Sequence, residues 1–267
     1  MPEGDTIHRA AARLDAVLTG SRVGGVGGSH REVVHHGRRI AGRTVTAVSA
    51  AGKHLLVAFD NGWMLRTHLG MPGAWHVYRA GERWRRSPGA ARVVLDTGEA
   101  VAVCFAAPTV QIAPEALVRR AIAHLGPDSA SPDFDLAEAA RRAAALPPAA
   151  PVADTLLDQG VLAGVGNVFK SEILFAERLH PLTPIGGLDE AALRLLVERA
   201  ARLLAANRER PRRLTTGVDR PGRRLWVYQR AGEPCRRCAA SIAAAWLGTP
   251  PRITFWCPSC QPEPART

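Results

Sequence analysis

Residues 158–167 read DQGVLAGVGN, and this stretch decides how the second half of the chain folds. Its three glycines separate two segments with helical patterns, 152–158 and 167–178. Glycine ends helices and lets backbone amides approach a phosphate closely, and a helix N-terminus is itself an anion site. The stretch therefore predicts a helix-turn-helix with Asn167 at the start of the second helix. The alternative is a glycine-rich turn with no binding role.

Downstream, four of the five cysteines form two close pairs, Cys235-x2-Cys238 and Cys257-x2-Cys260, with eighteen residues between the pairs. This spacing is typical of a zinc ribbon, whereas two disulfides are the alternative. Four thiolates complete a tetrahedron, so we expect one structural zinc ion and no organic cofactor. Arg252 precedes the second pair, where it is either a solvated charge or a DNA contact.

The first residues of the chain offer a nucleophile. Met1 is readily removed before a small residue, and Pro2 then carries a free secondary amine that titrates at about 7.7–8.0. A secondary amine that attacks a sugar C1′ gives a cationic iminium, and Glu3 adds a carboxylate that can shuttle protons. The alternative is an ordinary start residue followed by a first-turn acid. An amphipathic helix predicted over 5–18 fixes this end, with Asp5 or Thr6 as its cap.

Between these ends, residues 43–105 have the pattern of short antiparallel strands joined by turns, which favours a sandwich or barrel. Lys53 follows a glycine just before a strand, and it could be a phosphate ligand, a Schiff-base former or a surface lysine. Met71 lies on a Gly/Pro loop at 68–73, where it could be a core residue or a wedge that fills the gap left by an extruded base. The predicted strands are 44–48, 54–59, 63–67, 91–96 and 101–105.

The charge of the chain favours polyanions. Its 267 residues carry 35 Lys+Arg against 24 Asp+Glu, a net charge of +11. Such an excess points to nucleic acid first and an acidic membrane second. No apolar run approaches twenty residues, so we expect a cytosolic protein without a membrane partner. Only Lys53 and Lys170 are lysines, which suggests that an ammonium group is needed at each.

The composition changes after residue 111 from strand-like to helical. The predicted helices cover 114–125, 137–146, 152–158, 167–178 and 188–207. We place a domain boundary near 125–132, with the proline-rich segment 147–151 as the alternative. The predicted fold is therefore an α+β multidomain protein: an N-terminal antiparallel β-sandwich with flanking helices, a helical DNA-binding domain and a C-terminal zinc-ribbon finger. The expected domains are 1–125, 126–232 and 233–262, followed by a tail at 263–267.

The ordered set of motifs resembles one family. PEG at 2–4, GK at 52–53, LAGVGN at 162–167 and the four-cysteine finger occur in the order found in formamidopyrimidine-DNA glycosylases and endonuclease VIII. PEGDT at 2–6 and the run from Arg252 through the last two cysteines are closer to the endonuclease VIII branch. The resemblance covers nearly the whole chain and implies a helix-two-turn-helix around 158–167. It implies a bacterial, nucleoid-associated monomer that acts on damaged double-stranded DNA.

The resemblance also implies roles for individual residues. Pro2 would attack C1′ of the damaged nucleoside, and Glu3 would shuttle protons during base loss and ring opening. Lys53 would act beside them by gripping the phosphate next to the lesion. The remaining DNA contacts would come from Met71 in the vacated stack and from Asn167 and Arg252 on backbone phosphates.

Two positions depart from the family pattern. Thr6 stands where the family usually has a second glutamate, and Asp5 is one position away. Residues 104–108 read CFAAP in place of an Asp-Pro-Arg-Arg-Phe-type loop, which favours oxidised pyrimidines over 8-oxoguanine and leaves the residues that act with Met71 unassigned. A bifunctional glycosylase/AP lyase is the preferred hypothesis. The alternatives are a DNA-binding protein that lost catalysis, with Thr6 as the sign, and a zinc-ribbon RNA-binding protein.

Overall fold

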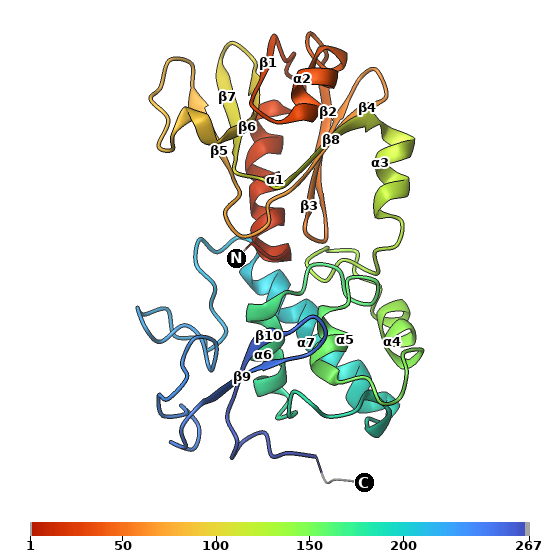
Figure 1. The fold of residues 1–267 in the computed structure, drawn as a ribbon, viewed down its shortest axis with the longest axis vertical. Helices are drawn as coiled ribbons and strands as arrows, with labels where there is room; N and C mark the ends of the chain where they lie inside the picture. The colour runs from red at the N-terminus through yellow and green to blue at the C-terminus, as the bar shows by residue number, and fades with distance from the viewer. Residues whose placement is uncertain (1, 265–267) are drawn as a thin grey trace. The chain divides into compact units, whose positions relative to one another are not determined.

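The computed structural model describes residues 2–264, so Met1 and its removal lie outside the described residues. The chain forms two compact units, the first ending at His124 and the second beginning at Leu125 (Figure 1). We call them unit 1 and unit 2 and describe each by itself. In residues 2–264 no helix is both long enough and apolar enough to cross a bilayer.

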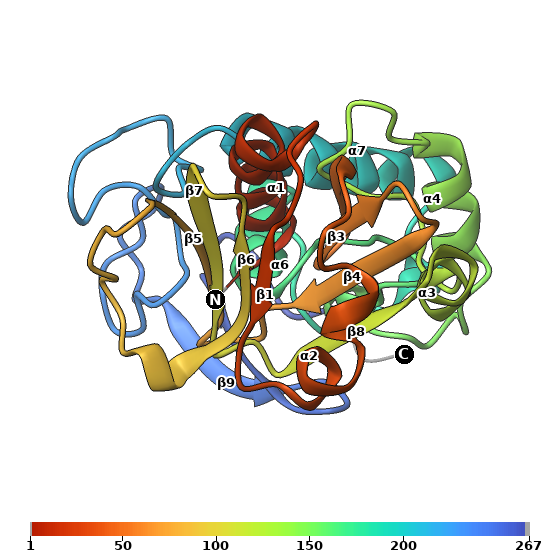
Figure 2. The ribbon, with the colours of Figure 1, turned by 90° about the horizontal axis from the view of Figure 1, so that it is seen from above.

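Unit 1 is a sandwich of antiparallel sheets with helices around it. One sheet has the strand order β1-β6-β7-β5 and the other β2-β3-β4-β8, and the view in Figure 2 separates the two. The elements are α1 Gly4–Leu18, β1 Gly25–Gly27, α2 Arg31–His36, η1 Gly37–Arg39, β2 Val45–Ala51, β3 His54–Phe59, β4 Trp63–His68, β5 Ala74–Arg79, η2 Pro88–Ala90, β6 Ala91–Asp96, β7 Ala100–Phe105, β8 Thr109–Pro114 and α3 Glu115–Ile122.

The core of unit 1 lies between these sheets and beneath α1. Alternate residues of the strands point inward, as period-2 patterning requires. The helix contributes Ile7, Leu14 and Leu18, each almost fully buried, to the same apolar cluster as both sheets. The Asp15 carboxylate also accepts a hydrogen bond from Val48 N in β2 at 3.1 Å. The helix therefore packs against the sandwich from Ile7 near its start to Leu18 at its end.

The structure confirms the predicted strands and the two predicted hairpins at 60–62 and 97–98. It adds β5 and β8, which the sequence did not predict. In β5 the polar His76 interrupts the apolar pattern. The strand β8 directly follows Pro108 and ends at Pro114, and prolines normally mark loops. The predicted caps of α1 were wrong, since Glu3 occupies the N-cap position and its side chain does not cap the helix.

Unit 2 contains a helical core followed by a small two-stranded hairpin. The helices pack around α6, whose residues 167–175 are all buried, so it is the central helix of the unit. The predicted helices are confirmed with ends shifted by a few residues. The elements are α4 Leu136–Ala144, α5 Val152–Leu157, α6 Asn167–Ala176, η3 Ile185–Gly187, α7 Glu190–Asn207, β9 Ala243–Leu247 and β10 Arg252–Trp256. Together the two units confirm the predicted α+β class.

Candidate active site and nucleic-acid interface

The N-terminal residues lie at the head of α1. Pro2 is half-buried, and Glu3 is fully buried at 0% exposure. The Glu3 carbonyl accepts hydrogen bonds from Thr6 N at 2.9 Å and Ile7 N at 3.1 Å, which begin the helix. Pro2 is thus followed in sequence by a fully buried carboxyl residue at the head of a helix that packs against the core. This is the arrangement that a fixed N-terminal amine with a neighbouring proton carrier requires.

Thr6 is tied to the residues around it. Its hydroxyl donates to Asp5 Oδ1 at 3.2 Å and accepts from Arg9 Nη2 at 3.5 Å. Asp5 is fully buried, so the first turn of α1 encloses a second carboxylate besides that of Glu3. Thr6, which stands where the family usually has a glutamate, therefore links Asp5 and Arg9 by hydrogen bonds in the first turns of α1.

Lys53 lies in a two-residue turn between β2 and β3. Ala51 pairs with His54 across the hairpin, and Gly52 has φ +56°, as the first central residue of a type II′ turn requires. A side chain at Gly52 would be strained there, so the glycine fixes where Lys53 points. The turn and the start of α1 lie at the same end of unit 1 (Figure 1).

Two histidines and an arginine gather near Lys53 on one face of the sheet, and we call this set the cationic cluster because Lys53 and Arg66 carry its charge. His54 faces His68 across β3 and β4, with ring centroids 5.1 Å apart, and Arg66 lies on the same face. Burial first, and then the charges of His68, Arg66, His124 and Lys53, lower the pKa of His54 to about 3. The pKa of His68 is lowered by burial and then by Lys53 and Arg66.

Two polar atoms of this cluster are buried without a hydrogen-bond partner among the described residues, His54 Nδ1 and Arg66 Nε. Neutral imidazoles beside an ammonium and a guanidinium group give this end of the sheet a positive potential. Such a surface attracts an anion.

Met71 lies outside this cluster on the loop between β4 and β5. It is 77% exposed, which is unusual for a large apolar side chain. The interpretation of Met71 as a core residue is therefore wrong, and its exposure fits the alternative of a wedge.

In unit 2, Asn167 is the first residue of α6, and Gly166 in the N-cap position provides no side-chain cap. The Asn167 side chain is nearly buried and donates through Nδ2 to Ile253 O at 2.7 Å. Ile253 follows the exposed Arg252 directly, so this bond brings the turn and the finger together. The start of α6 therefore lies beside the strand that begins at Arg252.

Gln159, a residue that sequence reasoning did not single out, holds the glycine-rich turn in shape. Its Nε2 donates to Leu157 O at 2.8 Å and to Val165 O at 3.0 Å, and its Oε1 accepts from Gly164 N at 3.2 Å. Only Gly164 in the turn has a positive φ, +98°. No local pattern marks a glutamine for this role.

Lys170 anchors the finger from α6. It is 1% exposed, and its Nζ donates to Thr254 Oγ1 in β10 at 2.7 Å. The scarcity of lysine pointed to this residue without saying what it does. An arginine fork would not fit a single buried hydroxyl acceptor as well as a compact ammonium group.

Glu172 is a fully buried charge on the same helix. One carboxylate oxygen accepts from Val227 N and Tyr228 N at 2.9 Å each, and the other from Trp226 N at 2.8 Å. The Thr215 hydroxyl donates to the second oxygen. Four donors thus satisfy the carboxylate, which fixes both ends of the segment 215–228.

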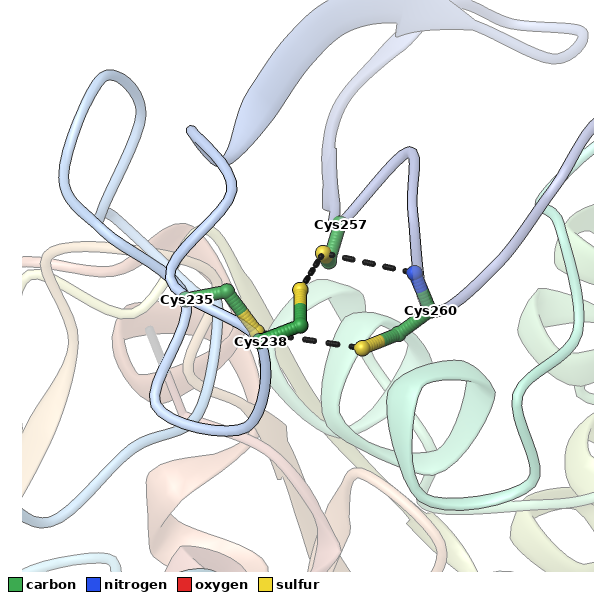
Figure 3. Close-up of side chains that lie close together, drawn as sticks. All are labelled: Cys235, Cys238, Cys257 and Cys260. Carbon is green, nitrogen blue, oxygen red and sulfur yellow. Dashed lines mark hydrogen bonds between the residues drawn. The ribbon is translucent and has the colours of Figure 1, made fainter.

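The four cysteines converge from two loops at the base of the finger (Figure 3). Their sulfur atoms all lie within 4.8 Å of one another, with 3.5 Å between Cys238 and Cys257 and 3.9 Å between Cys235 and Cys260. Sulfur ligands at about 2.3 Å from a tetrahedral zinc would be about 3.8 Å apart, so the donor set fits that ion. Cys260 N donates to Cys257 Sγ at 3.5 Å, and Cys104 lies apart, buried in β7.

The predicted residues therefore fall into two groups. Pro2, Glu3, Lys53 and Met71 lie in unit 1. Asn167, Arg252 and the four cysteines lie in unit 2. There the four cysteines come together, and Asn167 is hydrogen-bonded to the strand of Arg252.

Glu172→Gln should destabilise unit 2. The amide has one acceptor oxygen, and its NH2 group would face backbone donors. Hydrogen bonds to a charged group contribute about 1.5–3 kcal/mol each, so we expect at least that loss in the free energy of unfolding. Urea denaturation measures it, and limited proteolysis should show faster cleavage in 215–228. Glu198→Gln is the control, because it removes the same charge from an exposed i,i+4 pair with Arg202. Equal stability of the two variants would contradict the role of Glu172.

The cationic cluster predicts a pH dependence. The pKa of His54 is about 3 in the folded state and 6.5 as its ordinary value, so between these pH values the unfolded chain binds the extra proton. Stability should therefore fall as the pH drops from about 6.5 towards about 3. His54→Gln should lose less unfolding free energy than the wild type between about pH 7 and about pH 4.5 in urea titrations. The control is His35→Gln at an exposed position, and an equal loss in all three proteins would refute the prediction.

Comparisons with known proteins agree with this geometry. The family model for the Formamidopyrimidine-DNA glycosylase N-terminal domain matches residues 1–109, and that for the Formamidopyrimidine-DNA glycosylase H2TH domain matches residues 125–215. A crystal structure of the Lactococcus lactis formamidopyrimidine-DNA glycosylase bound to DNA with an AP site has the same fold. Its TM-score is 0.82 at 21% identity, and the match covers 98% of this chain and 100% of that chain.

Relatives at higher identity extend over the whole chain. A protein named probable endonuclease 8 2 from Streptomyces coelicolor is 41% identical, with 99% of this chain and 95% of that protein covered. The DNA-(apurinic or apyrimidinic site) lyase Nei2 of Mycolicibacterium smegmatis is 39% identical, with 98% and 99% covered. The chain therefore belongs to the formamidopyrimidine-DNA glycosylase and endonuclease VIII family of base excision repair glycosylase/lyases, and it is closer to the endonuclease VIII branch.

Proposed function

We propose that this chain is a bifunctional DNA glycosylase and AP lyase that removes oxidised bases, preferably pyrimidines, from double-stranded DNA. Membership of the family supports the class of reaction, and the net charge of +11 supports a polyanionic partner. The observation that carries the proposal is the fully buried Glu3, which follows Pro2 in sequence at the head of a helix packed against the core.

The first step is an attack by the Pro2 nitrogen on C1′ of the damaged nucleoside. The bond between C1′ and the base breaks, and the base leaves with a proton. Glu3 then gives a proton to O4′ as the sugar ring opens, which leaves an iminium between Pro2 and C1′. The step needs Pro2 to be the first residue, because Met1 would acylate its nitrogen.

The iminium then serves as the electron sink for strand cleavage. Removal of a 2′ proton breaks the C3′–O3′ bond in β-elimination, and a second elimination releases the 5′ phosphate. Water hydrolyses the remaining iminium, which releases the sugar fragment as an aldehyde and restores the amine of Pro2. Glu3 is the group placed to move these protons.

The DNA contacts follow from the charged and exposed groups. Lys53, with its cationic neighbours, would bind the phosphate next to the lesion, and Met71 would enter the vacated stack. Asn167, at the start of α6, and Arg252, at the start of β10, would hold backbone phosphates. We further propose a monomer in the bacterial cytoplasm, associated with the nucleoid and built of domains at 1–125, 126–232 and 233–262.

A second candidate is a protein of the same fold that binds damaged DNA without catalysis. Thr6 in place of the family glutamate favours it, whereas the enclosed carboxylates of Asp5 and Glu3 favour the enzyme. The two differ in one measurable property, which is a covalent bond to the substrate.

Borohydride trapping tests the enzyme. Protein whose intact mass shows loss of Met1 is incubated with duplexes carrying 5-hydroxyuracil or an abasic site, reduced, and mapped by mass spectrometry. We expect a cross-link at Pro2. With Glu3→Gln the cross-link should disappear on 5-hydroxyuracil and persist on the abasic site, because the abasic sugar has already lost its base and reaches the open-chain aldehyde without a proton from Glu3.

The contrary outcomes are distinct. A cross-link at Lys53 would keep the enzyme and change the nucleophile. Tight binding without a cross-link on either substrate would favour the binding protein, and Thr6→Glu would then be the variant to test for restored trapping.

We also propose that the four cysteines hold one zinc ion, which keeps the finger folded and takes no part in the chemistry. Purified protein should contain about one equivalent of zinc by elemental analysis. Cys257→Ser should lower this content and weaken DNA binding, whereas Cys104→Ala, which removes a thiol outside the cluster, should keep the metal. Full zinc content in Cys257→Ser, or a different metal in the wild type, would refute the assignment.

A further inference from the structure

The loop between β4 and β5, residues 69–73, is a tight turn that carries Met71. Gly73 N donates to Leu69 O at 2.9 Å, and a Cβ added at Gly73 would lie 2.2 Å from that oxygen. Gly70 has φ +58°, and a Cβ there would lie 2.8 Å from Pro108 Cγ. These close approaches define the path of the backbone. They do not involve the exposed side of the loop, which consists of Met71 and Pro72.

That side is held by an arginine from a different loop. Arg86 Nη1 donates to Pro72 O at 2.9 Å. Arg86 is itself exposed and belongs to the β5–β6 loop, residues 80–90, fourteen residues further along the chain. The pKa of His76 is lowered by burial and then by the charges of Arg86 and Arg85, which places both guanidinium groups near β5.

The β5–β6 loop has a firm base from which Arg86 extends. Trp84 stacks on Tyr78 with ring centroids 6.2 Å apart and meets Phe105 edge-on at 5.8 Å. Arg85 N donates to the hydroxyl of Tyr78 at 3.1 Å. Tyr78 and Phe105 are both buried in the sandwich. The backbone at residues 84–85 is therefore fixed to the core immediately before Arg86.

We infer that Arg86 is a positioning residue for Met71: it fastens the exposed side of the 69–73 loop to the anchored β5–β6 loop, so that Met71 stands ready to enter the base stack. This inference rests on the proposed function. Opening a base stack costs a few kcal/mol, and a wedge on a loop that must first be ordered would lose part of its insertion energy to conformational entropy. A loop fixed in advance avoids that loss.

The competing interpretation is that Arg86 would only add positive charge near DNA, in the same way as the exposed Arg83 of the same loop. Charge and positioning make different predictions. Loss of charge weakens binding and reduces its salt dependence at either arginine. Loss of the hydrogen bond from Arg86 to the Met71 loop should impair opening of the base stack. This effect should require Met71 to be present.

The experiment compares Arg86→Ala, Met71→Ala, the double variant, Arg83→Ala and Arg86→Lys in the full chain. For each, the rate of abasic-site cleavage in duplex DNA is divided by its rate in single-stranded DNA, where no stack has to be opened. The fluorescence of 2-aminopurine placed next to the lesion reports stack opening directly, and salt titrations of binding report charge.

We expect the duplex to single-strand ratio and the 2-aminopurine signal to fall roughly tenfold in Met71→Ala and in Arg86→Ala, and no further in the double variant, because both changes remove one wedge. Arg86→Lys keeps a donor for Pro72 O and should recover part of the signal. Arg83→Ala should reduce the salt slope as Arg86→Ala does, with a ratio close to that of the wild type.

The inference fails if Arg86→Ala gives the same ratio as Arg83→Ala, or if its effect and that of Met71→Ala multiply in the double variant. Failure of the proposed function looks different. In that case the wild type itself would neither form a borohydride cross-link nor cleave single-stranded abasic DNA.

Discussion

The buried carboxylate of Glu172 is the constraint on which unit 2 depends. A charge with 0% exposure is tolerated only when its lone pairs are occupied, and here backbone amides of 226–228 and the hydroxyl of Thr215 occupy them. Those donors belong to residues 215–228, an irregular segment without the regular backbone hydrogen bonds of a helix or a sheet. The charge therefore pulls the chain between α7 and the finger onto α6 and gives it a defined course.

The same helix then supports the finger. A two-stranded hairpin is marginally stable by itself, so β9 and β10 need support from outside. The cysteine cluster supports their base, and Asn167 and Lys170 bind Ile253 O and Thr254 Oγ1 near the start of β10. Arg252, which precedes these two residues, is thereby held beside the N-terminus of α6.

Unit 1 solves a similar problem with an apolar core. The residues to which we assign roles in catalysis or DNA binding extend from its sandwich at three places. These are the head of α1, the β2–β3 turn and the loop of Met71. Each is fixed by a different local device: a buried helix for Glu3, a positive-φ glycine for Lys53 and a hydrogen bond from Arg86 for Met71. Functional groups on short loops over a rigid scaffold can keep the geometry that catalysis demands.

These devices differ in how far the sequence reveals them. Periodicity predicted α1 and the strands, and spacing predicted the cysteine cluster, because both depend on neighbours in the chain. The sequence NVFKSEILFA of α6 suggests that Lys170 and Glu172 face solvent, since charged residues on a helix usually do. They are buried because residues 215–228 and 254, more than forty positions downstream, cover them. A contact between residues so far apart in the sequence leaves no local pattern. For α6, the scarcity of lysine was the one feature of the sequence that drew attention to Lys170.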